Sequence, residues 1–151
     1  MNNAEVKALT RKSIECLKLD DEKAAVPNGL EFYKFLFKNA PQLKKFFKGA
    51  EDYTPEQVEK SDRFAKQGVR HMLSMHVLAD TYDDQATFLA FTRELANKHL
   101  AFKIPDETFE AFFPLWVDFL SSKGLTAEGK AAWLQLGKTF TAEFRKHLRA
   151  H

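Results

Sequence analysis

The sequence predicts an all-α protein. Apolar residues recur at helical spacing along nearly the whole chain, and no segment shows the strict alternation that is typical of a strand. Only six glycines and five prolines interrupt the 151 residues, so breaks between helices are few. The 15 phenylalanines indicate an aromatic-rich interior, which either a large flat ligand or a plain aromatic core would explain. We expect one domain, residues 1–151, with six or seven substantial helices.

Prolines and helix caps set the expected elements of the first half. Pro27 and Pro41 each suit the start of a helix, because a proline needs no hydrogen-bond acceptor in a first turn. Thr54 accepts from the backbone as an N-cap, Pro55 fits the first helical position, and Gln57 completes a capping box. The expected helices are 4–19, 27–39, 42–47 and 61–79, with a charged connection at 20–25.

The second half is expected to hold three further helices. The first of these helices starts near Asp83 and Asp84, and the second starts at Pro105. Thr126 caps the last helix. Pro114 falls inside the second of these, where we expect a kink. The expected ranges are 83–100, 105–124 and 127–148. These helices are too many for a four-helix bundle, so non-bundle packing around an interior site is expected.

Composition excludes several classes of function. The net charge is only +2, and the basic residues do not form a run, so no nucleic-acid partner is expected. No segment approaches the roughly 18 uninterrupted apolar residues of a membrane span. The single cysteine, Cys16, excludes an internal disulfide framework and fits a reducing compartment. Residues 1–17 lack the apolar core of a signal peptide, so a cytoplasmic location is expected.

No enzyme motif is present, and no catalytic residue is predicted. The GxSxG, P-loop, GxGxxG and HExxH patterns are all absent. His71 and His76 are five residues apart, which is a poor helical spacing for one metal ion. His147 and His151 lie in a basic C-terminal turn and are expected to be solvated. His99 remains, and its spacing to other residues decides how it is interpreted.

Pro41 and Phe47 are six residues apart, Gln67 follows Phe47 by 20 residues, and His99 follows Gln67 by 32. This order and spacing resembles that of the globin family, in which a proline opens a short C helix and a phenylalanine follows six residues later. A distal residue follows about twenty residues on, where this chain has Gln67, and a proximal histidine about thirty beyond that, where it has His99. The segment 103–105 is similar to the turn that opens helix G. The residues that carry the resemblance are, in order, Tyr33, Pro41, Phe47, Gln67, His99 and Pro105.

Within the family, the chain is most similar to nematode intracellular globins, which are myoglobin-like haemoglobins. Tyr33 and Gln67 match their characteristic distal pair. The resemblance covers nearly the whole chain, and although each motif is weak, their order and spacing together are specific. The similar segments are 46–48, 51–54, 64–68, 82–84, 91–95 and 98–99.

The resemblance implies helices A to H around one haem b (heme, iron protoporphyrin IX) and reversible oxygen binding at ferrous iron. His99 would be the metal ligand, and Tyr33 and Gln67 would bind oxygen as donors. No CxxCH motif exists, so the haem is expected to be held without a covalent link. Dioxygen is the expected partner, and a homodimer is left open. The expected cofactor-binding residues are Phe47, Gln67, His71, His99 and Ile104.

His71 departs from the family pattern, in which an aliphatic residue is usual. It lies four residues after Gln67 and therefore on the same helix face. It could donate to the bound ligand, ligate iron directly, or turn aside and bond elsewhere. We expect a five-coordinate ferrous state with His71 near the ligand, and an effect on ligand release as its imidazole protonates below about pH 6.

The implied role is oxygen storage, transport or facilitated diffusion. Three rivals remain at this level. One is a redox-active or sensor globin that handles nitric oxide or peroxide, which ligation of iron by His71 would favour. The second is a haem pigment that absorbs light, and the third is a haem-free helical interaction protein.

Overall fold

The computed structural model describes residues 1–151, and none of them forms a β-strand. The prediction of an all-α protein is therefore confirmed. No helix combines the length and the apolar character that crossing a membrane requires. The α-helices are α1 (Asn3–Ser13), α2 (Glu22–Asn39), α3 (Pro55–Glu59), α4 (Asp62–Thr81), α5 (Gln85–His99), α6 (Phe112–Ser121) and α7 (Ala127–Ala150). The 3-10 helices are η1 (Pro41–Phe46), η2 (Leu100–Phe102) and η3 (Asp106–Ala111).

The contacts between residues divide the chain into two compact units. We call residues 1–13 and 77–151 the terminal unit, and residues 14–76 the middle unit. Helix α4 is continuous across the boundary, so most of it belongs to the middle unit and its last turn to the terminal unit.

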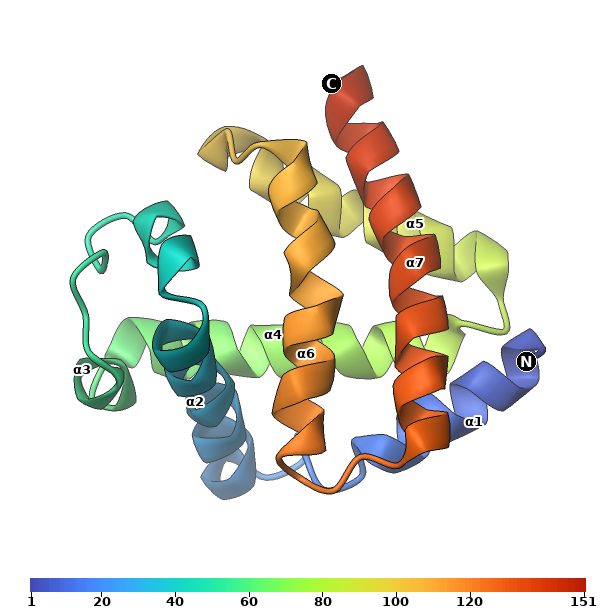
Figure 1. Ribbon diagram of the computed structural model, residues 1–151, viewed down its shortest axis with the longest axis horizontal. Helices are drawn as coiled ribbons and strands as arrows, with labels where there is room; N and C mark the ends of the chain where they lie inside the picture. Colours follow the sequence, from blue (N-terminus) through green and yellow to red (C-terminus); the bar gives the residue numbers. More distant parts are fainter. The chain divides into compact units, whose positions relative to one another are not determined.

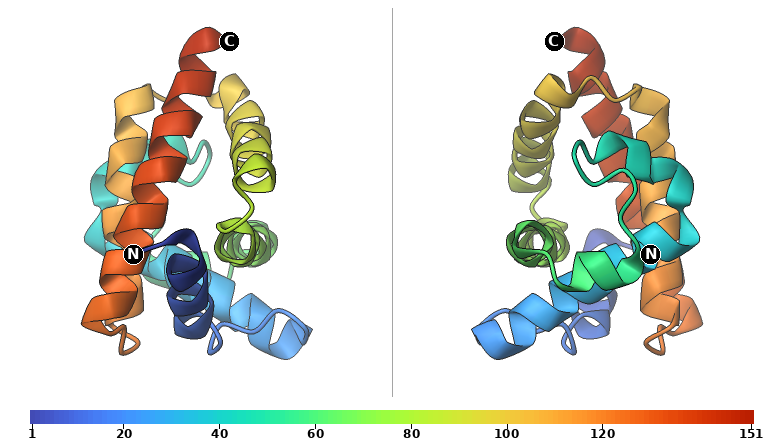
Figure 2. Two further views of the ribbon diagram at one scale, coloured as in Figure 1. Left: turned by 90° about the vertical axis from the view of Figure 1, so that its right-hand side faces the viewer. Right: turned by 90° about the vertical axis from the view of Figure 1, so that its left-hand side faces the viewer.

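Helix α7 is the centre of the terminal unit. It packs against α5, α1, α6 and η3, and it runs antiparallel to α6 at its side (Figures 1 and 2). Trp116 and Trp133 are fully buried, and the indole of Trp133 donates a hydrogen bond of 2.7 Å to the hydroxyl of Ser13. A Cβ atom at Gly137 would lie 2.5 Å from the Phe113 ring, so glycine is what lets this ring pack directly on α7.

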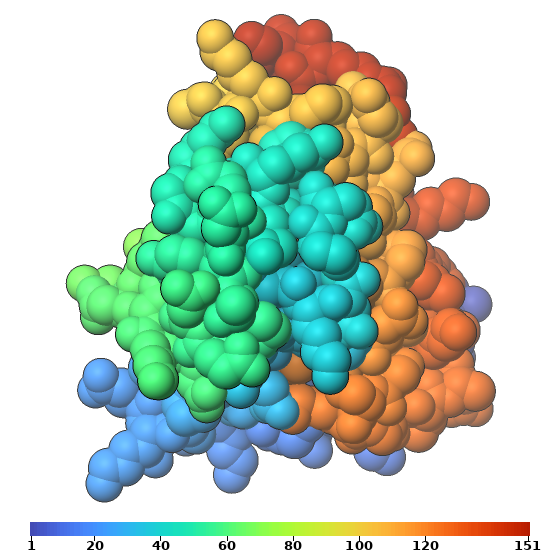
Figure 3. Space-filling view, turned by 60° about the vertical axis from the view of Figure 1, so that its left-hand side comes forward, coloured from blue at the N-terminus to red at the C-terminus, as the bar shows by residue number.

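The middle unit is built on α2, which packs against η1 and α3 (Figure 3). Helices α2 and α4 meet backbone to backbone at Gly29 and Gly68. A Cβ atom at Gly29 would lie only 2.4 Å from the carbonyl carbon of Gly68, so neither position has room for a side chain. His76, at the end of the unit, lies 2.7 Å from the carbonyl oxygen of Leu17 through its Nε2 atom. These contacts fix how α4 lies against α2.

Two predicted helix boundaries near the N-terminus are wrong. Helix α1 ends at Ser13 rather than near residue 19, and the hydroxyl of Ser13 donates to the carbonyl of Thr10 in the last turn. Helix α2 begins at Glu22, within the predicted connection, because the side chain of Asp21 accepts from the backbone of Lys23 as an N-cap. Pro27 therefore lies inside α2 instead of starting it.

The predicted helix over 105–124 is wrong, because it is two elements that meet two residues before Pro114. Residues Asp106–Ala111 form the 3-10 helix η3, and α6 begins at Phe112. Pro114 is the third residue of α6, where its backbone nitrogen needs no partner within the helix. The capping box of Thr54 and Gln57 and the N-cap at Thr126 are confirmed.

Candidate functional site

His99, the predicted metal ligand, is the last residue of α5 in the terminal unit. Its Nδ1 atom lies 2.7 Å from the carbonyl oxygen of Leu95, one turn earlier in the same helix. A carbonyl oxygen can only accept, so Nδ1 carries the proton and donates. The Nε2 atom then keeps an in-plane lone pair, which is the form of imidazole that binds a metal ion.

Three phenylalanines contact the ring of His99. Phe102, Phe109 and Phe144 present their rings to it at centroid distances of 5.9, 5.6 and 5.5 Å, all edge to face. Burial lowers the pKa of His99, against a smaller opposing effect of its bond to Leu95. The imidazole is therefore neutral at physiological pH, as a metal ligand must be.

Ile104, another predicted cofactor contact, follows η2 in the same unit. The preceding residue, Lys103, has a left-handed backbone with φ of 53°, and Pro105 follows at the start of η3. Ile104 is half-buried. This sharp turn leads the chain into η3, whose Phe109 contacts the ring of His99.

Tyr33 is buried in the middle unit, on α2. Its ring centroid lies 5.8 Å from that of Phe47, the predicted haem contact, and 5.2 Å from that of Phe64. Burial raises the pKa of Tyr33 to about 12, although a hydrogen bond with the side chain of Gln67 works in the opposite direction. Tyr33 thus keeps its phenolic proton at every physiological pH and can donate it to a ligand.

Gln67 lies on α4 and is linked to Tyr33 by that hydrogen bond. This bond lowers the pKa of Tyr33, in opposition to the larger effect of burial. Gln67 is half-buried and therefore keeps part of its amide accessible. The predicted distal pair is thus a hydrogen-bonded pair in the structure.

His71 stacks on Phe32, a residue of α2. The two ring centroids are 4.2 Å apart with an angle of 16° between the planes, and the ring of Tyr33 stands edge-on to His71 at 6.0 Å. Part of the His71 side chain is exposed, but its Nε2 atom is shut off from solvent. Burial lowers the pKa of His71 to about 3. The expected protonation below about pH 6 is therefore wrong, because the buried ring cannot hold a charge there.

The structure brings four of the predicted site residues together in the middle unit, and it places His99 and Ile104 in the terminal unit. The four are Tyr33, Phe47, Gln67 and His71. Sequence reasoning missed Phe32 as the partner of His71. No sequence signal could have found it, because only the structure shows that α2 and α4 meet at Gly29 and Gly68, three residues before Phe32 and His71.

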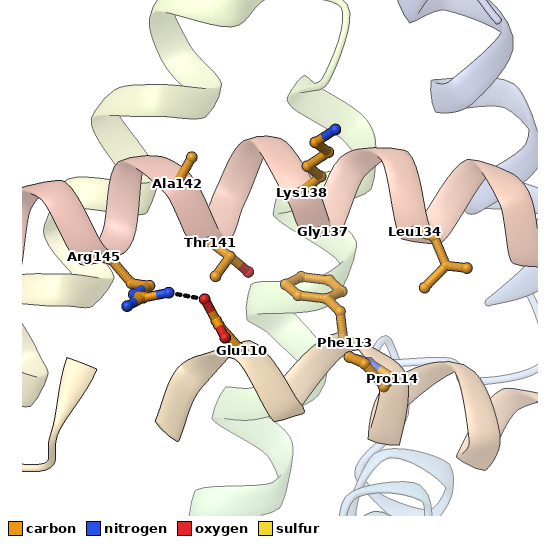
Figure 4. Close-up of a pocket in the computed structure, with 9 residues that line it drawn as sticks. All are labelled: Glu110, Phe113, Pro114, Leu134, Gly137, Lys138, Thr141, Ala142 and Arg145. Atoms are coloured by element: carbon orange, nitrogen blue, oxygen red, sulfur yellow. Dashed lines mark hydrogen bonds and ion pairs between the residues drawn. The ribbon is translucent and has the colours of Figure 1, made fainter. Parts of the chain in front are cut away.

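A groove of about 430 Å³ lies elsewhere on the terminal unit, between α6 and α7 (Figure 4). Phe113 forms its floor, and the ion pair of Arg145 with Glu110 closes one end. None of the predicted site residues lines this groove. It is separate from the residues that point to a cofactor.

Comparison with known protein families gives the decisive finding. The family model described as Globin matches residues 30–144, which include all the predicted site residues. The chain belongs to the globin family. The suspected family is thus confirmed, and with it the globin fold.

Relatives of this globin lie among the nematode globins, as the resemblance implied. It is 44% identical to the globin, cuticular isoform, of Nippostrongylus brasiliensis, over 98% of this chain and 86% of the relative. It is 45% identical to the myoglobin of the same species, over 82% and 80% of the two chains. The solved structure of Caenorhabditis elegans globin-like protein GLB-1 is 41% identical, covers 99% of this chain and 96% of its own, and superposes with a TM-score of 0.95.

Membership in this family establishes haem binding, and reversible binding of dioxygen through the haem, as the function of this globin. The residues fit such a group on their own chemistry. His99 offers a neutral imidazole in the ligating tautomer, and Tyr33 offers a protonated hydroxyl. The redox, sensor, pigment and haem-free alternatives are not favoured.

The expected cytoplasmic location is wrong. Beside the cuticular relative, the extracellular globin of Pseudoterranova decipiens is 39% identical over 97% of this chain and 45% of that protein. The sequence signals used for the expectation do not report on location. A secretory leader is removed from a mature chain, and one cysteine forms no internal disulfide in any compartment.

Proposed function

We propose that this globin binds one non-covalent haem b, with His99 as the proximal ligand and with Phe47, Gln67, His71 and Ile104 among its contacts. Ferrous haem supplies reversible oxygen binding. The bond from Nδ1 of His99 to Leu95 carries the proposal, because it fixes both the tautomer and the orientation of the imidazole. The edge-to-face contacts with three phenylalanines also restrict the rotation of the His99 ring.

Tyr33 and Gln67 are proposed to hold the oxygen ligand. Tyr33 keeps its proton because burial raises its pKa to about 12, so the hydroxyl donates to the ligand. In this proposal Gln67 donates to the phenolic oxygen. That bond orients the hydroxyl and makes it a stronger hydrogen-bond donor, because it lowers the pKa of Tyr33. Two coupled donors favour slow release of oxygen, since hydrogen bonds to a partly charged acceptor are stronger than hydrogen bonds to a neutral one.

The proposed role is non-enzymatic oxygen storage, transport or facilitated diffusion. Relatives that are named myoglobin and globin support this role. The names of the cuticular and extracellular relatives support a location outside cells. Immunolocalisation in the source tissue tests the location, and a signal confined to cell interiors would contradict it.

An absorption spectrum of the purified ferrous protein, with and without oxygen, tests the proposed function. We expect a five-coordinate deoxy spectrum that converts reversibly on exposure to oxygen. Acid–organic extraction should release all of the haem, because no thioether attachment motif exists. A colourless product, or haem that stays with the polypeptide, would contradict the proposal.

A further inference from the structure

The stack of His71 on Phe32 lies directly beside the closest approach of α2 and α4. Gly29 and Gly68 meet backbone to backbone, and each ring belongs to the residue three positions further along its own helix. Residues three apart lie on the same face of a helix, so the glycine contact places both rings in one layer. With no room for a Cβ atom at either glycine, the helices cannot slide without breaking this layer.

Packing holds the imidazole of His71 on two sides. Phe32, which is 2% exposed, covers one face at 4.2 Å, and Tyr33 abuts its edge. To reach a metal ion, an imidazole must turn a ring nitrogen toward it, since the lone pair lies in the ring plane. Such a rotation would separate the rings and leave the inner face of Phe32 against an unfilled space.

Protonation does not keep His71 from acting as a ligand. Burial lowers its pKa to about 3, so the ring is neutral and competent to bind iron throughout the physiological range. Gln67, one turn earlier on the same helix face, is engaged with Tyr33. A neutral histidine on the ligand side of a haem would therefore compete with oxygen unless its rotation were restrained.

We propose that Phe32 is a positioning residue that holds His71 off the iron, and so keeps the sixth coordination position open for oxygen. The inference rests on the haem site proposed above. Phe32 acts through His71 and touches neither haem nor oxygen in this account. A stacked aromatic pair is worth a factor of about two to thirteen in such an equilibrium. Loss of the stack should raise the ratio of six- to five-coordinate ferrous haem by about two- to thirteenfold.

The test compares the ferrous deoxy spectra of Phe32→Leu, Phe32→Leu with His71→Leu, and Phe37→Leu. We expect a low-spin six-coordinate fraction in Phe32→Leu that disappears in the double variant. Phe37→Leu is the matched control, because Phe37 is an equally buried phenylalanine of α2 whose ring contacts are Phe47 and Phe64. It should stay five-coordinate. Phe32→Tyr, which keeps a ring for the stack, should also stay five-coordinate.

A second measurement covers the case in which Phe32→Leu fails to fold. In the diamagnetic carbon monoxide complex of the wild-type protein, nuclear Overhauser effects should connect the ring protons of His71 with those of Phe32. Their absence would overturn the inference, and so would a Phe32→Leu spectrum as five-coordinate as wild type. A six-coordinate wild-type protein would overturn it as well. Failure of the wild type to take up haem would overturn the proposed function itself, which separates the two failures.

Discussion

The Nδ1 atom of His99 lies 2.7 Å from the carbonyl oxygen of Leu95, at the end of α5. Leu95 lies one turn before His99 in the same helix, and its carbonyl oxygen has a second lone pair that can accept this bond. The bond fixes the tautomer and the orientation of the His99 imidazole. Both are what the proposed role of His99 as haem ligand requires.

Removal of the His99 side chain should therefore remove the haem. We expect His99→Gly to purify without haem, or with haem only when imidazole is supplied in the buffer, because free imidazole can replace the missing ligand. Absorption spectra with and without imidazole measure this. Wild-type-like ferrous spectra without imidazole would show that another residue is the ligand. His147→Gln is the control, since His147 is paired with Asn97 on the surface, and it should keep its haem.

The hydroxyl of Tyr33 should set the rate at which oxygen leaves. A hydrogen bond to a partly charged acceptor is worth about 1.5–3 kcal/mol, so Tyr33→Phe should speed oxygen dissociation by about tenfold to a hundredfold. Gln67→Leu should act in the same direction by less, because it removes the group that orients the hydroxyl. Stopped-flow measurement of oxygen release decides the matter. An unchanged rate in Tyr33→Phe would mean that the hydroxyl does not contact the ligand.

Buried His71 should make stability depend on pH between about 3 and 6.5. In the folded chain burial lowers its pKa to about 3, whereas an unfolded histidine titrates near 6.5. Between these values the unfolded state binds more protons, so the free energy of unfolding falls as the pH falls, by at most about 1.4 kcal/mol per pH unit. His71→Leu should remove this contribution. Urea denaturation of both proteins at several pH values measures the difference.

The same pKa implies that oxygen release shows no step due to His71 between pH 5 and 8. The ring stays neutral over that interval, so its charge cannot act on the ligand. Oxygen dissociation in wild type and His71→Leu should therefore vary with pH in parallel. A step near pH 6 that is present only in the wild type would contradict the burial of this ring.

Sequence reasoning succeeded where one local interaction decides the structure. The caps at Thr54 and Thr126 were readable because the capping side chain and its partner are at most three residues apart. The start of α2 was misplaced because two local signals compete there. Asp21 begins the helix, and Pro27 is tolerated inside it, although a proline alone predicts a start.

The site was predictable in its residue types and spacing, and less so in its packing. Spacing along the chain identified His99 and the pair of Tyr33 and Gln67 through resemblance, but their roles at the haem stay predictions. Phe32 and His71 are 39 positions apart in the sequence and lie on different helices, so only the folded structure shows that their rings stack. The pKa of His71 follows from that burial, which is why the expectation from an unperturbed histidine failed. The homodimer, the lack of a nucleic-acid partner and the single domain also stay predictions.

The contact of Gly29 with Gly68 provides the last prediction. A Cβ atom at Gly29 would lie 2.4 Å from the Gly68 backbone, which cannot rotate away as a side chain can. Gly29→Ala should therefore push α2 from α4 and lower the free energy of unfolding by about 1–3 kcal/mol, despite the better helix propensity of alanine. The displacement should also loosen the pair of Tyr33 and Gln67, which bridges these helices, and so speed oxygen dissociation.

Gly124→Ala is the matched control for this change. Gly124 has a positive φ of 91° and no atom within 4 Å of an added Cβ, so its substitution costs about 1–2 kcal/mol through the backbone alone. Both variants should lose stability in urea denaturation, but only Gly29→Ala should change the oxygen dissociation rate in stopped-flow measurements. Equal oxygen kinetics in the two variants would show that the distal pair does not depend on the glycine contact. The comparison thus separates a loss of stability from a displacement of the helices that carry the site.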